Sequence, residues 1–154
     1  MSHPAPIPRN WLKRKLDWAL GSSLWYFHAH FGCCGDEVTQ SFGARYDLER
    51  FGCRKQTDPS RADLLLVSGA LNKKGGALIQ DIYTQMLDPK FVIAVGACAC
   101  SGGGFEKENG IQGLSSWIPV DVFVPGCPPR PEAIMHGIFS LQQKITKVGV
   151  RWND

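Results

Sequence analysis

The sequence has no hydrophobic stretch long enough to cross a membrane. A spanning helix needs about 20 consecutive apolar residues, whereas the longest candidates, Leu64–Val67 and Phe91–Val95, have the length of single β-strands. Residues Met1–Asn10 contain no continuous apolar region, so a signal peptide is not indicated. We therefore expect a protein of the cytosol, or one attached to a structure on the cytosolic side.

The sequence also has no large excess of positive or negative residues. The 154 residues include 17 Lys and Arg and 14 Asp and Glu, a net charge of +3. This balance gives no support for a nucleic-acid partner. The sequence contains no G-x-S-x-G elbow, no Walker A loop and no G-x-G-x-x-G followed by the acid that dinucleotide binding requires. The common hydrolase and nucleotide-binding classes are therefore not indicated.

Cysteine is the residue type that is unusually frequent, with six copies. In a reducing compartment cysteines are rarely paired in disulfides. A metal ion, an iron–sulfur cluster or redox chemistry is therefore the first interpretation, and inert buried thiols are the alternative.

Strand-like and helix-like segments alternate along the chain. The strand-like segments are 23–31, 61–69, 91–96 and 120–124. Helical spacing is seen at Leu78, Ile82 and Met86 and at Ile134, Ile138, Leu141 and Ile145, where Pro131 suits a first turn. Continuous apolar runs are typical of parallel strands buried on both faces. The pattern predicts a single α/β domain with a mainly parallel sheet and helices on both faces.

The N-terminal segment has a different composition. Residues 1–9 are proline-rich and predict a tail, and Asn10 is a suitable cap for a helix that ends at Gly21. Trp11 and Trp18 accompany several basic residues, so this helix either lies on a membrane or a partner, or packs on its own domain. We predict a tail and amphipathic helix over 1–21 and an α/β domain over 22–154.

Three of the predicted strands end in loops that contain cysteine. The first loop contains Cys33 and Cys34, the second Cys98 and the third Cys127. Sites in parallel sheets form outside the carboxyl ends of the strands. If the strands are neighbours, these four thiols converge on one edge of the sheet. The glycines beside them allow the backbone to approach a bulky group closely.

The adjacent pair Cys33-Cys34 favours a cluster over a single ion. Structural zinc sites usually separate paired cysteines by two to four residues so that both sulfurs reach one ion. Neighbouring cysteines do this poorly, whereas a cubane offers four separate irons. We therefore favour [4Fe–4S] over zinc, with inert thiols as the third possibility. Cys100 is a possible substitute ligand or points away, and Cys53 is expected to be an inert core or surface thiol.

Polar residues near the cysteine pair are candidates for proton transfer or for tuning. His28 and His30 alternate along a strand and should face the same side, where they either deliver protons or are ordinary half-buried histidines. Glu37 follows the pair and either relays protons, tunes a potential or simply favours a helix N-terminus.

These residues carry a family resemblance. The matching segments are Ser23-Leu24-Trp25, Gly32-Cys33-Cys34, Arg45–Gly52, Ala62-Asp63, Gly96-Ala97-Cys98 and Val120–Pro129. From about Ser22 to Ile145 the chain resembles the B (PSST-type) subunit of complex I, the NADH:quinone oxidoreductase. It also resembles the related small subunits of membrane-bound hydrogenase-like respiratory complexes.

The resemblance implies a flavodoxin-like fold and one [4Fe–4S] cluster on Cys33, Cys34, Cys98 and Cys127. This is the terminal cluster of the electron chain, at the interface with a large hydrogenase-like subunit. A ferredoxin-like iron–sulfur subunit supplies electrons, and integral membrane subunits translocate ions. The implied location is peripheral, on the cytoplasmic side of the cell membrane. Arg45 and Arg50 match a basic motif near the cluster or the large subunit, although surface ion pairs are the alternative.

The terminal acceptor that the resemblance favours is quinone. Quinone-reducing members carry apolar residues where this chain has Tyr26–Phe31 and Val38-Thr39-Gln40. These more polar segments favour an alternative, a ferredoxin-driven ion-pumping complex that reduces sulfane sulfur. Protons are a weaker candidate, because the related hydrogenases usually have C-x-x-C in place of Cys33-Cys34. In each case the chain is a subunit of an oxidoreductase without activity of its own.

Overall fold

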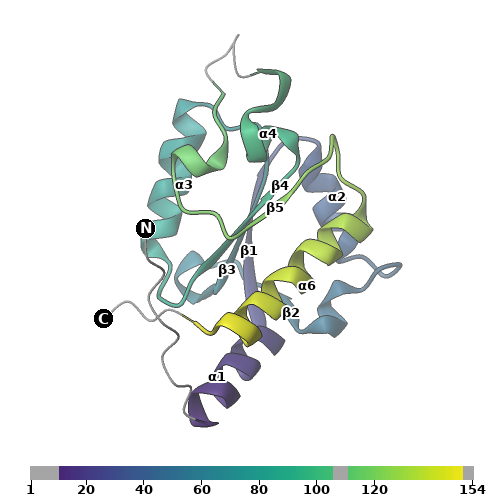
Figure 1. Ribbon diagram of the computed structural model, residues 1–154. Helices are drawn as coiled ribbons and strands as arrows, with labels where there is room; N and C mark the ends of the chain where they lie inside the picture. The colour runs from purple at the N-terminus through teal and green to yellow at the C-terminus, as the bar shows by residue number, and fades with distance from the viewer. Residues whose placement is uncertain (1–10, 106–110, 151–154) are drawn as a thin grey trace.

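The computed structural model describes residues 11–105 and 111–150, which form a five-stranded sheet between two layers of helices (Figure 1). The strands are β1 (Leu24–Phe31), β2 (Cys53–Lys55), β3 (Leu64–Gly69), β4 (Phe91–Val95) and β5 (Val122–Val124). The α-helices are α1 (Trp11–Ser22), α2 (Cys34–Ser41), α3 (Lys73–Gln85), α4 (Ala97–Ser101) and α6 (Pro131–Val148). Short 3₁₀ turns are η1 (Leu48–Phe51), η2 (Pro59–Arg61), η3 (Gly103–Phe105) and η4 (Leu114–Ser116).

The strand order is β2-β1-β3-β4-β5, and each neighbouring pair is parallel. This is the order of a flavodoxin-like, doubly wound sheet, whose direction of winding changes between β1 and β3. The predicted α/β domain with a parallel sheet and helices on both faces is therefore confirmed. Strand β2 was not predicted, because three residues are too few to show a periodicity.

Alternating side chains give the sheet two buried faces. One face packs Leu24, Leu66 and Val95 against residues of α2 and α6. The other packs Leu65, Val67 and Ala94 against residues of α3 and α4. All six residues of the central strand β3 are buried, as expected for a parallel strand covered on both sides.

The helical spacing identifies the buried side of α6 correctly and that of α3 only in part. Ile134, Ile138, Leu141 and Ile145 of α6 are all buried, and Pro131 occupies the first turn. In α3, Leu78 is 51% exposed while Ile79 is fully buried. A strict four-residue repeat drifts around a helix of 3.6 residues per turn, so Leu78 lies off the buried side.

Helix α1 packs against α6 at the end of the sheet opposite α4 (Figure 1). Gly21 permits this contact, because a Cβ there would lie 3.0 Å from Thr146 Oγ1. The carboxylate of Asp17 is buried, and its Oδ1 accepts a hydrogen bond from the Val150 amide at 3.2 Å. The predicted tail and the cap residue Asn10 lie outside the described residues. Within the described ranges, no helix has the length and hydropathy needed to span a bilayer.

We expect Leu141→Ala to destabilise the protein strongly. Leu141 is fully buried in the cluster between the sheet and α6, and such truncations cost about 2–5 kcal/mol of unfolding free energy. Leu87→Ala is the matched control, because Leu87 is 71% exposed and should change the unfolding free energy by less than about 0.5 kcal/mol. Denaturant unfolding measures both values. Equal losses would contradict this assignment of the core.

Candidate functional site

Four cysteines lie in three loops at the carboxyl end of the sheet. Cys33 directly precedes α2 and Cys34 is its first residue, at the end of β1. Cys98 lies in α4 after β4, and Cys127 follows β5. In Figure 1 the beginning of α2, helix α4 and the end of β5 are at the same end of the molecule.

Close packing of Gly96 shows that these loops meet. Gly96 follows β4 directly, and a Cβ at this position would overlap the Sγ atom of Cys34. A Cβ on Gly103 would lie 3.1 Å from Cys98 Sγ. We expect the thiols to converge if their strands are neighbours. Strands β4 and β5 are neighbours, whereas β3 lies between β1 and β4. The thiol of Cys34 nevertheless reaches across β3 to the end of β4.

The thiols are also close enough to affect one another electrostatically. Burial is the main cause that raises the pKa of Cys34 to about 12, and the neighbouring Cys33, Cys98 and Cys127 raise it further. Burial also raises the pKa of Cys98, followed by the effects of Cys127 and Cys33. Negative charge accumulated on these sulfurs is therefore unfavourable unless a cation or a positively charged group compensates it.

Backbone hydrogen bonds hold the three loops in place. The amides of Gly96 and Ala97 donate to the carbonyls of Val124 and Gly126, each at 2.8 Å. These bonds join the loop of Cys98 to the loop of Cys127. The Gly35 amide donates to the Gly32 carbonyl at 2.9 Å and closes the turn that contains Cys33 and Cys34.

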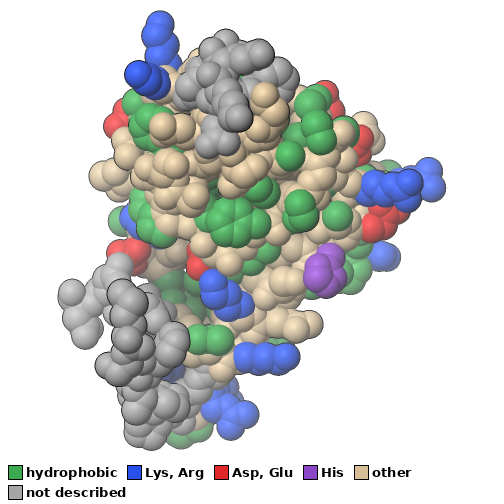
Figure 2. Space-filling model, turned by 45° about the horizontal axis from the view of Figure 1, so that its top comes forward, with side chains coloured by type: hydrophobic (Ala, Val, Ile, Leu, Met, Phe, Trp, Pro, Cys, Tyr) green, Lys and Arg blue, Asp and Glu red, His purple; other side chains and the backbone are tan. Residues whose placement is uncertain are grey.

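Exposure differs among the four cysteines. Cys34 is buried, Cys98 is half-buried, and Cys33 and Cys127 are exposed. The site therefore opens to the surface, and Phe123 of β5 is 48% exposed. Figure 2, which turns this end toward the viewer, shows hydrophobic side chains across its centre and most charged side chains near the margins.

The donor set consists of thiols, the donor type that iron–sulfur clusters use. Four thiols come from three loops, and the space beside Cys34 and Cys98 is kept free by glycines rather than by side chains. Thiolates are the usual ligands of such clusters. Within 11–105 and 111–150, no group of three or more His, Cys, Asp or Glu side chains is arranged to hold a metal ion.

The thiols of the remaining two cysteines are directed into the core. Cys53 is fully buried in β2, and burial raises its pKa to about 12, which makes it an unreactive thiol. Cys100 packs against the core on the α3 and α4 side. Its Sγ lies 3.7 Å from the carbonyl oxygens of Ala94 and Val124, so the thiol is directed toward the strands.

The two histidines of β1 face the same side, as their alternation indicates. Their rings stack with centroids 5.5 Å apart. His28 Nε2 is hydrogen-bonded to Ser68 Oγ at 2.9 Å, and His30 Nε2 donates to the Gly32 carbonyl at 2.7 Å. Burial, followed by the nearby His30 and Lys55, lowers the pKa of His28 to about 4. His28 is therefore neutral at pH 7.

The charged candidates occupy the surface around α2 and η1. Glu37 lies in the first turn of α2 and is half-buried. The guanidinium of Arg45 lies 5.6 Å from the Tyr46 ring centroid, and that of Arg50 lies 4.7 Å from the Phe51 ring centroid. In the described part of the chain, neither arginine forms an ion pair with Asp47 or Glu49.

Several residues of this region were not singled out from the sequence. Ser68 is buried beside His28, and the Tyr46 hydroxyl donates to Glu132 Oε1 at 3.2 Å. The second contact joins the segment after α2 to the start of α6, which follows the Cys127 loop. A long separation in sequence hides both pairs, and no local pattern would have revealed them.

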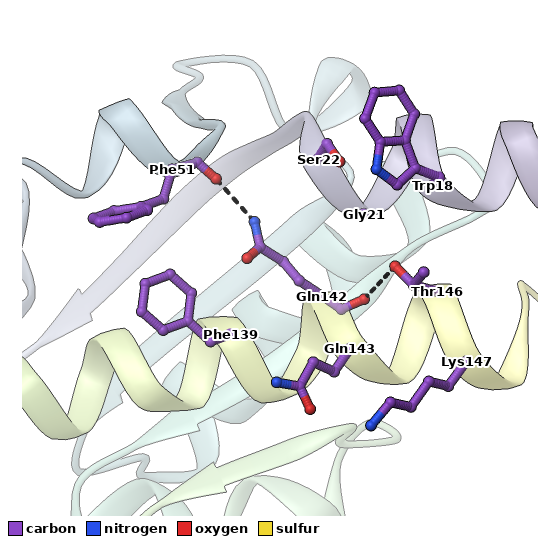
Figure 3. Close-up of a pocket in the computed structure, with 9 residues that line it drawn as sticks. All are labelled: Trp18, Gly21, Ser22, Phe51, Phe139, Gln142, Gln143, Thr146 and Lys147. Carbon is purple, nitrogen blue, oxygen red and sulfur yellow. Dashed lines mark hydrogen bonds between the residues drawn. The ribbon is translucent and has the colours of Figure 1, made fainter.

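A separate cavity of about 410 Å³ lies between α1, η1 and α6 (Figure 3). Trp18, Phe51 and Phe139 line it, and Gln142 donates to the Phe51 carbonyl at 2.9 Å across it. Its lining residues include no cysteine, histidine or acid. This cavity therefore has no part in the cysteine site.

The fold and the four gathered thiols define a class of protein: a flavodoxin-like α/β domain with a cysteine site at the carboxyl edge of its sheet. Residues 32–141 match the family model described as NADH ubiquinone oxidoreductase, 20 Kd subunit. The chain belongs to this family. It is therefore a complex I-like respiratory subunit, and it functions in electron transport as part of an oxidoreductase complex.

Individual relatives agree with this assignment. The NADH-quinone oxidoreductase B subunit of Geotalea daltonii is 44% identical over 146 residues, covering 92% of this chain and 86% of the relative. The corresponding protein of Flavobacterium johnsoniae is 46% identical over 134 residues, covering 86% and 74%.

Two solved structures are similar to the fold. A chain of the membrane-bound sulfane sulfur reductase, an archaeal respiratory membrane complex, is 40% identical with a TM-score of 0.79, covering 86% of this chain and 76% of that one. A chain of the [NiFeSe] hydrogenase of Desulfovibrio vulgaris Hildenborough is 18% identical with a TM-score of 0.56, covering 83% and 62%. The hydrogenase likeness concerns the fold alone.

We expect Gly96→Ala to disturb the cysteine site without removing a thiol. A Cβ at position 96 would overlap Cys34 Sγ, and the φ angle of +92° is unfavourable for alanine. Thiol labelling of the purified chain should show Cys34 more accessible in the variant. Gly104→Ala is the matched control, because its Cβ would meet nothing within 4 Å. Identical Cys34 labelling in both variants would contradict the packing described above.

Proposed function

We propose that Cys33, Cys34, Cys98 and Cys127 hold one [4Fe–4S] cluster and that this chain is the terminal electron-transfer subunit of a membrane-bound respiratory oxidoreductase. The observation that carries the proposal is the approach of three cysteine loops at one edge, where Gly96 leaves room for Cys34. When bound, such a cluster accepts and releases one electron at a time.

The protein contributes position, burial and charge to this chemistry. Cys34 lies inside the domain, while Cys33 and Cys127 lie at its surface. A group held between them is partly shielded from water and also close to whatever covers this edge. Burial, hydrogen bonds and nearby charge are the properties through which a protein sets a cluster potential. His28, His30, Glu37, Arg45 and Arg50 are the candidates for tuning or proton delivery.

The exposed part of the site is where we place the partner subunits. A large hydrogenase-like subunit would cover Cys33, Cys127 and Phe123 and contain the acceptor site. A ferredoxin-like subunit would supply electrons, and integral membrane subunits would translocate ions. The names of the relatives support a place for this chain in a respiratory complex of several subunits.

We propose quinone as the acceptor, on the basis of 44% identity to a B subunit of NADH-quinone oxidoreductase over most of both chains. Sulfane sulfur is the second candidate. It is favoured by the 40% identity to a chain of the sulfane sulfur reductase complex. The two histidines beside the Cys33-Cys34 turn also favour it, because they make this side of the site polar.

The cysteine assignment predicts which substitutions remove the cluster. In membranes that contain the assembled complex, Cys98→Ser and Cys127→Ser should abolish the low-temperature EPR signal of the reduced [4Fe–4S] cluster. Cys53→Ser and Cys100→Ser are the matched controls and should retain it, because both thiols are directed into the core. Loss of the signal in the Cys53 variant would show that the ligand set is wrong.

The same membranes identify the acceptor. After reduction of the wild-type complex, oxidation of the cluster signal is followed after addition of a short-chain quinone or of polysulfide. Rapid oxidation by quinone supports the first candidate, and oxidation by polysulfide alone supports the second. A complex whose wild-type chain contains no iron would contradict the whole proposal.

We further propose that the chain lies peripherally on the cytoplasmic side of the membrane and that α1 contacts anionic lipid. Large apolar side chains of α1 are exposed, with Trp11 at 65%, Trp18 at 63% and Leu12 at 54%. The acid of this helix, Asp17, is buried, while Arg14 and Lys15 are exposed. Exposed Trp with cationic neighbours is typical of helices that lie in a lipid interface.

Vesicle binding tests the role of α1. The full-length chain should sediment with phosphatidylglycerol vesicles and less with phosphatidylcholine vesicles, because Arg14 and Lys15 attract anionic headgroups. Trp11→Ala with Trp18→Ala should weaken binding at least about tenfold, which corresponds to about 1.4 kcal/mol. Trp25→Ala is the control outside α1. Equal binding of all variants would contradict the proposed contact of α1 with lipid.

A further inference from the structure

The turn that contains Cys33 and Cys34 is organised around one carbonyl oxygen. Gly32 O accepts a hydrogen bond from the Gly35 amide at 2.9 Å and a second from His30 Nε2 at 2.7 Å. Gly32 has a φ angle of +120°, which directs the chain out of β1 and into the turn. The imidazole of His30 therefore stabilises the backbone between the strand and the two cysteines.

The ring of His30 also fills the space beside Gly35. A Cβ at position 35 would lie within the imidazole ring, in contact with its Cγ, Cδ2 and Nε2 atoms. Gly35 is buried, and it directly follows Cys34 in the first turn of α2. An imidazole at 30 and a side chain at 35 are thus mutually exclusive in this arrangement.

The His30 ring is held in place by a second histidine, His28. It stacks on His28 at an interplanar angle of 11°, and His28 is hydrogen-bonded to the fully buried Ser68. Because the pKa of His28 is lowered to about 4, the neighbouring ring carries no charge at pH 7. The bond to Gly32 requires the His30 tautomer that has a proton on Nε2. This N–H is also present when both ring nitrogens are protonated.

We propose that His30 and Gly35 form a matched pair that positions the Cys33-Cys34 turn and thereby sets the environment of the cluster. His30 is in this view a positioning residue that acts through Gly32, not a proton donor to the acceptor. The inference rests on the proposed function, because it concerns the two cysteines as ligands. The side chain at position 30 must then donate a hydrogen bond to Gly32, but it need not be titratable.

Two substitutions at position 30 separate the donor from the titratable group. In the assembled complex, His30→Gln retains an N–H donor and should keep the EPR line shape, the midpoint potential and the pH profile of turnover. His30→Leu retains bulk but cannot donate, so it should change the line shape. Its midpoint potential should fall, because the negative end of the Gly32 carbonyl loses a donor.

A double-mutant cycle tests the steric half of the pair. Gly35→Ala should reduce the iron content of the chain at least about twofold, although alanine is the better helix former. In the His30→Ala background the clash is absent, so Gly35→Ala should cost little further iron. Coupling of this kind is expected only for residues in direct contact. Circular dichroism of each variant reports whether the chain is folded.

The possible results separate failure of the matched pair from failure of the proposed function. A wild-type EPR spectrum in folded His30→Leu, or additive effects of the substitutions at 30 and 35, would overturn the matched pair. A shifted pH profile in His30→Gln with an unchanged spectrum would also overturn it and would assign His30 to proton delivery. Absence of the signal from the wild-type complex contradicts the proposed function itself, and so is not confused with failure of this inference.

Discussion

The arrangement of this protein depends on one close approach, between the end of β4 and the thiol of Cys34. Only a glycine at 96 leaves the space that this sulfur occupies. The approach brings a loop from β1 to the loops of β4 and β5, although β3 lies between them. Two backbone hydrogen bonds from Gly96 and Ala97 then hold the third loop against the second. The gathering of the cysteine loops depends on this contact.

Burial makes the cysteine edge asymmetric. On the inner side Cys34 is buried and its pKa is raised, and Ser68 is hydrogen-bonded to His28, on which the exposed His30 stacks. On the outer side Cys33 and Cys127 are exposed. A buried group that carries charge is costly unless it is compensated, whereas an electron must leave through a surface that a partner can reach. The combination suits a subunit that transfers electrons within an assembly.

Helix α1 exposes large apolar side chains beside basic ones and buries its acid. It buries the carboxylate of Asp17 against the amide of Val150 and leaves two tryptophans in contact with solvent. Burial of apolar area is the dominant favourable term in folding and association. Covering the exposed tryptophans with an apolar phase or surface would therefore be favourable. The cysteines lie at the opposite end of the sheet, so the surface of α1 and the cysteine edge are separate parts of the molecule (Figure 1).

The sequence by itself determined the parallel α/β class, the buried stripe of α6 and the four candidate thiols, because these features depend on local periodicity and residue type. The tertiary structure alone decided the strand order, the short strand β2, the exposure of Leu78 and the turning of Cys100 toward the strands. It alone also paired His28 with Ser68 and His30 with Gly35. The first pair arises only when β1 and β3 are packed side by side, and the second depends on the shape of the turn between β1 and α2, which no periodicity encodes.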